Sequence, residues 1–181
     1  MWSVTTYVAL LRGINLGPTR KVPMADLRRW LTDLGYGAVR THLQSGNAVF
    51  TSDRKPAELV REIERRLADE LGFEVACVVV THKDLRRVVD GNPFATVATN
   101  PSRYLVAFLS GAATPTLLKG LDPEGYKPEL FQIGEREIYL WHPEGIQNST
   151  LNKELYKRKL GVVATARNWN TVLKLLEMSA E

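Results

Sequence analysis

Two short polar stretches stand beside apolar segments in the first third of the chain, and their side chains suit the binding of an anion. The first is RGINLG, residues 12–17, and the second is QSGN, residues 44–47. A guanidinium can hold a phosphate or a carboxylate through two parallel hydrogen bonds, and the amides at a helix start add positive potential. We therefore predict a ligand site made of Arg12, Asn15, Arg20, Lys21, Gln44, Ser45 and Asn47.

The first half of the chain also predicts the elements that bring these stretches together. Apolar spacing, turn residues and stop glycines predict strands at 4–11, 39–44, 47–52 and 73–80 and helices at 24–34 and 56–71. This order is the β-α-β-β-α-β unit of ferredoxin-like folds. In such a unit the end of the first strand and the turn between the second and third strands lie at one end of the sheet. We expect the two polar stretches to be neighbours there.

The second half of the chain repeats this order more weakly. Its predicted elements are strands at 103–111 and 162–166, a hairpin at 130–142 turned at Gly134, and helices at 116–121, 151–161 and 166–178. We predict an α+β fold of two tandem ferredoxin-like subdomains from an internal duplication, with an extra C-terminal helix. The subdomains cover residues 1–84 and 103–181, and residues 85–102 form a linker helix and a Pro/Asn-rich connection.

A second polar cluster lies in TARNWN, residues 165–170. Thr165 is the predicted cap of the last helix, and Arg167, Asn168 and Asn170 crowd its first turn. These groups could hold an anion, or they could dock the helix by binding neighbouring backbone. The sequence slightly favours docking.

The charge balance argues against an extended nucleic-acid surface. The net charge is +4, from 24 basic and 20 acidic residues. Residues 1–50 hold six basic and two acidic residues, which is the entire excess. A local excess this small can attract one phosphate, but it is not the basic stripe that dominates nucleic-acid affinity.

Cysteine, histidine and hydropathy set further limits. The single cysteine, Cys77, lies in an apolar strand, so an internal disulfide is excluded, and three scattered histidines supply no zinc cluster with it. We expect no metal and no cofactor. The chain has no apolar run of the roughly 20 residues that cross a bilayer, and its N-terminus lacks the features of a signal peptide. We therefore expect a cytoplasmic protein without a membrane partner.

Six motifs together resemble one known family over nearly the full length of the chain. They are YVALLRGINLG, KVPMADLR, LQSGNAVF, NPF, PEGI and LGVVATARNWNTVLKLLE. The chain resembles the bacterial family called domain of unknown function 1697, which implies two ferredoxin-like subdomains and supplies no activity. Two positions depart from the family pattern: His42 stands where an aromatic residue is common, and Pro18 follows Gly17 where glycine and polar residues are usual.

Several functions stay open at this point, and binding of a small anionic ligand is favoured. An enzyme has little support, because Ser45 has no visible base and no histidine has a carboxylate at a telling spacing. Electrostatic catalysis on a phosphoryl or acyl substrate by Arg12 and Lys21 is one alternative. RNA binding on an open sheet face is another, although Arg40, His42 and Gln44 form no aromatic platform. A third is an assembly protein whose sheet faces bury each other or a second chain; the sequence indicates no oligomeric state.

Overall fold

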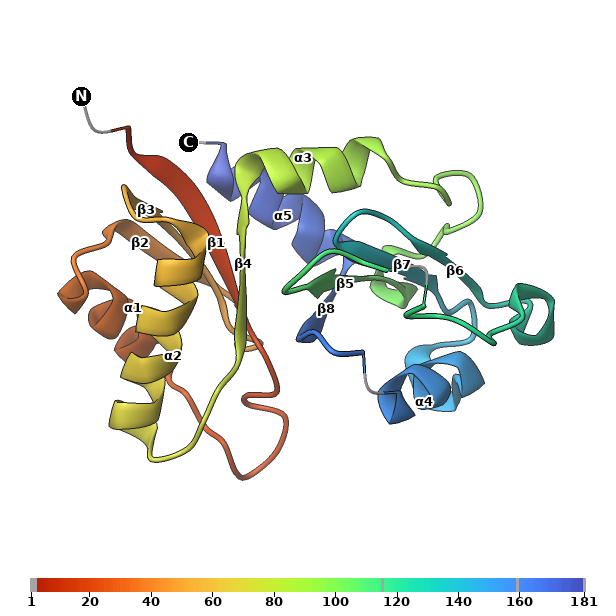
Figure 1. Cartoon of the computed structure of the whole chain (residues 1–181), viewed down its shortest axis with the longest axis horizontal. Helices are drawn as coiled ribbons and strands as arrows, with labels where there is room; N and C mark the ends of the chain where they lie inside the picture. Colours follow the sequence, from red (N-terminus) through yellow and green to blue (C-terminus); the bar gives the residue numbers. More distant parts are fainter. Residues whose placement is uncertain (1–2, 115, 159, 181) are drawn as a thin grey trace. The chain divides into compact units, whose positions relative to one another are not determined.

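Each of the two sheets in the computed structural model has four antiparallel strands (Figure 1). The structure describes residues 3–114, 116–158 and 160–180, and these residues contain five α-helices. The chain divides into two units, the first made of residues up to Arg86 together with those from Lys174 onward, and the second of Arg87–Leu173. The fold is therefore α+β, as predicted.

The first unit holds a sheet in the order β2-β3-β1-β4. Its strands are β1 (Thr5–Leu11), β2 (Gly37–His42), β3 (Asn47–Ser52) and β4 (Cys77–Thr81), and its inserted helices are α1 (Met24–Asp33) and α2 (Pro56–Leu71). Both helices cover the same face of the sheet (Figure 1). Their buried Leu27, Leu31, Leu59 and Ile63 pack with alternate residues of β1, since period-2 alternation sends those side chains to one face.

Local sequence explains where α2 begins and ends. Pro56 occupies the first helical position, where its missing N–H costs nothing. Leu59, Ile63 and Leu67 recur every four residues and are buried, which gives the helix a single apolar stripe. Gly72 ends the helix in the left-handed conformation at φ +78°. The predicted bounds and the observed ones agree.

The second unit holds a sheet in the order β6-β7-β5-β8. Its strands are β5 (Tyr104–Leu109), β6 (Leu130–Ile133), β7 (Glu137–Trp141) and β8 (Ala164–Asn168), and α4 (Thr150–Lys157) lies between β7 and β8. A core of Leu109, Leu117, Leu118, Ile138, Leu140 and Leu151 covers one face of this sheet. The remaining helices, α3 (His82–Asp90) and α5 (Trp169–Ser179), each contain a boundary between the two units. None of the helices described is long and apolar enough to cross a bilayer.

Three predicted helices differ from the structure. The helix predicted at 151–161 ends at Lys157, because the backbone of Arg158 is extended. Residues 116–120 form turns, with Leu117 and Leu118 buried, because a five-residue segment that ends at the left-handed Gly120 is too short to propagate a helix. The last helix begins at Trp169 rather than at residue 166. The preceding residues form β8 instead, since Thr165 and Arg167 pair with Phe108 and Val106 of β5.

Candidate functional site

The structure brings the two predicted polar stretches together at one end of the first sheet. Leu10 pairs with Asn47 across β1 and β3, and the Leu11 N–H donates to the Gly46 carbonyl at 2.9 Å. The Asn15 side chain donates to the Gln44 carbonyl at 2.8 Å. We call residues 12–21 together with residues 43–47 the loop end.

Asn15 acts as a clamp within the loop end. Its Nδ2 donates to the carbonyls of Val22, at 2.9 Å, and Gln44, at 2.8 Å. Its Oδ1 accepts the Val22 N–H at 2.8 Å. Both amide hydrogens are therefore used, and the backbone at φ +56° is one that asparagine tolerates well. Asn15 holds the loop and is not placed to take a ligand.

The Arg20 side chain also binds groups within the protein. Its Nε donates to the Gly13 carbonyl and its Nη2 to the Glu74 carbonyl, both at 2.9 Å. The guanidinium lies 4.8 Å from the centre of the Phe73 ring, which is within cation–π distance. Arg20 therefore ties the loop to the segment before β4, a partner 54 residues away in the chain.

Asn47 and Gly46 shape the turn before β3. Asn47 is fully buried, and its Nδ2 donates to the His42 carbonyl at 2.7 Å and to Ser45 Oγ at 3.0 Å. Gly46 has φ +89°, and a Cβ there would lie 2.8 Å from side-chain atoms of Leu11 and Ile14. Only glycine fits this position without displacement of the core.

Arg12 and Lys21 differ from these clamp residues. Both side chains are exposed, and neither forms a hydrogen bond or ion pair with a residue that the structure describes. Gln44 and Ser45 are also exposed. Of the seven predicted ligand residues, three hold the loops together and four face solvent.

The second predicted cluster is part of a strand end. Arg167 is buried in β8, where its Nη1 donates to Thr165 Oγ1 at 2.7 Å and to the Ala166 carbonyl at 2.9 Å. Burial lowers the pKa of this guanidinium to about 10. Asn168 accepts the Thr171 N–H at 3.0 Å and so caps α5, while Asn170 is exposed. The expectation that Thr165 caps the helix was wrong, because strand pairing occupies that residue.

The sequence reasoning missed a buried polar cluster in the second unit. Glu129 Oε2 lies 2.5 Å from His142 Nδ1 and 2.5 Å from Ser149 Oγ. Ser149 also accepts the Asn152 N–H at 2.8 Å, so its own proton is donated to Glu129. The His142 side chain is completely covered and that of Glu129 is 14% exposed. We call Glu129, His142 and Ser149 the Glu129 cluster.

The pairing register of the β6–β7 hairpin could have predicted this cluster from the sequence. Leu130 pairs with Trp141 across β6 and β7, so Glu129 and His142 form the next pair beyond the strands. A hairpin turned at Gly134 was predicted, and extending its register by one pair brings the two residues opposite each other. Ser149 joins them because it caps α4.

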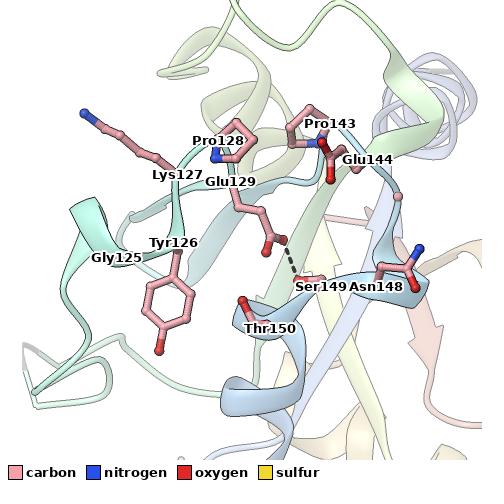
Figure 2. Close-up of a pocket in the computed structure, with 11 residues that line it drawn as sticks. Gly125, Tyr126, Lys127, Pro128, Glu129, Pro143, Glu144, Asn148, Ser149 and Thr150 are labelled. Atoms are coloured by element: carbon pink, nitrogen blue, oxygen red, sulfur yellow. Dashed lines mark hydrogen bonds between the residues drawn. The ribbon is translucent and has the colours of Figure 1, made fainter.

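Two hollows flank the Glu129 cluster. One of about 200 Å³ is lined by Glu129, Ser149, Tyr126, Thr150 and Glu144, and Figure 2 shows the Glu129 carboxylate pointing toward the start of α4 within it. The other, of about 340 Å³, is lined by His142, Arg103, Leu105, Glu144 and Ile146 among others. In the described part of the chain no three His, Cys, Asp or Glu side chains are grouped to hold a metal ion.

A solved structure and a family model match this chain. The structure is described as that of conserved bacterial protein SP0830 from Streptococcus pneumoniae, with 28% sequence identity and a TM-score of 0.77. The likeness covers 98% of this chain and 99% of that one. No curated protein matches.

The family model is described as "Protein of unknown function (DUF1697)" and matches residues 4–139. The matched region includes the loop end and Glu129, whereas His142 and Ser149 lie beyond it. The chain therefore belongs to the DUF1697 family of proteins of unknown function.

Proposed function

We propose that this protein binds a small anionic ligand, carrying a phosphate or carboxylate group, at the loop end. Arg12 and Lys21 supply the positive charge, and Gln44 and Ser45 supply further polar groups. The observation that carries the proposal is that Arg12 and Lys21 are exposed and form no ion pair with any described residue. Arginine and lysine both bind phosphate, arginine through two parallel hydrogen bonds.

The fixed backbone of the loop end supports this proposal. Asn15, Arg20 and Asn47 all bind backbone carbonyl groups, so the segments that carry Arg12 and Lys21 are held before a ligand arrives. A binding site that is already ordered loses less conformational entropy on binding. The clamp residues are thus the frame of the proposed site rather than its ligand contacts.

The start of α1 adds positive potential close to Lys21. The helix begins at Met24, and no side chain caps it at Pro23. The first amides of a helix carry a partial positive charge that favours an anion. Asp26 in the first turn is paired with Arg29 at 2.8 Å, which offsets its negative charge.

The same sheet order in both units supports an internal duplication of a ferredoxin-like unit. The order β2-β3-β1-β4 corresponds, strand for strand, to β6-β7-β5-β8. The units differ where the first helix stands in the first unit, because residues 116–120 of the second unit form turns instead of a helix. On this proposal the second copy has lost its first helix.

No observation favours the RNA or catalytic alternatives over ligand binding. Aromatic side chains on β5 and β7, Tyr104, Tyr139 and Trp141, are buried and present no platform for base stacking. Arg40, one of the residues considered for RNA binding on the open sheet face, donates from its guanidinium to the Met178 carbonyl at 2.8 Å. Electrostatic catalysis would use Arg12 and Lys21, the same cations as the proposed site. The same variants therefore also test the catalytic alternative.

The test is a thermal-shift screen of nucleotides, phosphorylated metabolites and acyl carboxylates, followed by calorimetry on any hit. A ligand at about 100 times its Kd stabilises the native state by about 2.7 kcal/mol. We expect the Arg12→Ala/Lys21→Ala double variant to abolish that shift. The control is Arg61→Ala/Arg65→Ala, which removes two exposed cations from α2. A screen without hits, or a hit that the double variant leaves unchanged, contradicts the proposal.

A further inference from the structure

The hollow of about 340 Å³ beside the Glu129 cluster is lined in part by His142, whose imidazole has one buried nitrogen without a hydrogen bond to any described residue. Glu129 Oε2 lies 2.5 Å from His142 Nδ1 and also accepts the Ser149 hydroxyl. A carboxylate that accepts twice fixes the proton of the ring on Nδ1. His142 Nε2 is then the remaining polar atom, and it is buried without a hydrogen bond to any described residue.

An unused buried nitrogen of this kind is unusual in a folded protein. Roughly nine in ten or more buried polar groups have a hydrogen-bond partner, which is a protein group or an ordered water molecule. His142 is 1% exposed as a residue and lines the larger hollow. With Nδ1–H donated to Glu129, the neutral ring offers Nε2 as a hydrogen-bond acceptor. The partner it suits is a donor such as an ammonium or hydroxyl group.

Groups of both charges line the same hollow. Arg103 and His142 are neighbours, because the His142 N–H donates to the Arg103 carbonyl at 3.0 Å. The Arg103 guanidinium donates to the Pro143 carbonyl at 2.5 Å, and Glu144 is the next residue along. An anion would be attracted by Arg103 but repelled by Glu144. A cation would be attracted by Glu144 but repelled by Arg103. Leu105 and Ile146 complete the lining with apolar surface.

We propose that this hollow binds a small zwitterion of the amino-acid class with an apolar side chain. Its carboxylate pairs with Arg103, and its ammonium group donates to His142 Nε2 and pairs with Glu144. Its side chain packs against Leu105 and Ile146. The volume of about 340 Å³ lies at the lower end of the range of small-molecule sites, which matches a ligand of this size.

Ligand access requires a small shift of the wall. The His142 side chain has no exposed surface, so a donor reaches Nε2 only when neighbouring residues move. Ile146, Gln147 and Asn148 line the hollow, form a single 3-10 turn and are exposed. A short exposed turn with few buried contacts opens at low free-energy cost. This turn is therefore the part of the wall that moves in our proposal.

The test reads His142 directly in the unmodified protein. Nitrogen-15 NMR of histidine-labelled protein resolves the three imidazoles, and His42→Gln and His82→Gln assign the His142 signals by elimination. Titration with leucine, valine, methionine and phenylalanine should shift the Nε2 resonance of His142 with at least one of them. N-acetyl-leucine lacks the ammonium group and leucine amide lacks the carboxylate, so we expect both to leave that resonance unchanged.

Calorimetry on variants then tests the two charged contacts. Arg103→Gln and Glu144→Gln replace exposed side chains, and each should weaken amino-acid binding by about tenfold or more, as expected for hydrogen bonds to charged groups. The control, Lys119→Gln, changes an exposed residue outside both hollows and should bind normally.

Two results would overturn the proposal. One is a His142 Nε2 resonance that none of the amino acids moves at millimolar concentration. The other is binding that Arg103→Gln and Glu144→Gln leave unchanged, which would place the ligand elsewhere. Neither result bears on anion binding at the loop end, because the Arg12→Ala/Lys21→Ala variant tests that site separately.

Discussion

The loop end and the Glu129 cluster use polar residues in opposite ways. In the loop end the polar side chains bind backbone carbonyls of neighbouring segments, and the cations that remain face solvent. In the Glu129 cluster the polar side chains bind one another out of water, and one nitrogen has no partner among the described residues. A stretch rich in polar residues can therefore be a clamp, whereas three residues within a span of about twenty can bind one another in a covered cluster.

The largest effect should come from the Glu129 cluster, because one carboxylate there accepts from two buried side chains. Glu129→Ala leaves the His142 and Ser149 donors in the interior without their acceptor. Each buried donor left without its acceptor costs about 1–3 kcal/mol, so we expect a loss of about 2–5 kcal/mol in stability. Urea unfolding followed by circular dichroism measures it.

Glu124→Ala is the matched control for this variant. It removes a carboxylate that is 71% exposed and pairs with Lys127 at 2.9 Å. Exposed pairs of this kind contribute about 0–1 kcal/mol. Equal losses for the two variants would show that the Glu129 cluster is no more than a surface arrangement.

A smaller loss is expected where the loop end packs on the core. Gly46→Ala introduces a Cβ that lies 2.8 Å from Leu11 and Ile14 atoms, in a backbone with φ +89°. Strain and overpacking together should lower the free energy of unfolding by about 2–4 kcal/mol. Gly13→Ala separates the two causes, since Gly13 has φ +66° but no atom within 4 Å of its Cβ position. If Gly13→Ala costs as much as Gly46→Ala, overpacking plays no part.

The clamp interpretation predicts a further loss for Asn15→Ala. The substitution leaves the Val22 and Gln44 backbone groups without their side-chain partner and places alanine at φ +56°. Because these groups are partly accessible to water, we expect about 1–3 kcal/mol in urea unfolding. Asn170→Ala, at an exposed position of α5, is the control and should change stability by less than about 0.5 kcal/mol. An Asn15→Ala protein as stable as the control would remove Asn15 from the clamp.

Sequence patterns predicted the elements of the first unit well because local signals agree there. The α2 pattern repeats every four residues between Pro56 and Gly72, and β3 lies between a tight turn and a polar end. The helix signal of residues 116–121 is too short, and that of residues 165–168 was overridden by strand pairing with β5, which depends on a distant part of the chain. Propensity in a short window does not contain that information.

The sequence predicted that the two polar loops share a sheet end, as the structure shows, while their binding of a ligand stays a prediction. Topology alone places Gln44 near Asn15, because strand order determines which loops share a sheet end. The role of Arg20 could not be predicted from the sequence, because its partners Phe73 and Glu74 belong to a segment more than fifty residues away. His142 was hidden for a similar reason: its carboxylate lies across a hairpin, at a spacing that no local motif records.

The smallest effect on stability should come from Arg12, and this separates a cation that binds a ligand from one that holds the fold. Arg12→Ala removes an exposed side chain without a described partner, so we expect a change within about 0.5 kcal/mol in urea unfolding. Arg20→Ala removes two hydrogen bonds and the contact with Phe73, so its loss should be about 1–2 kcal/mol. Ligand binding should show the reverse order, because only Arg12 has its donors free for an anion. An Arg12→Ala protein that is as destabilised as Arg20→Ala would mean that both arginines are clamps, and Lys21 would then be the sole cation available at the loop end.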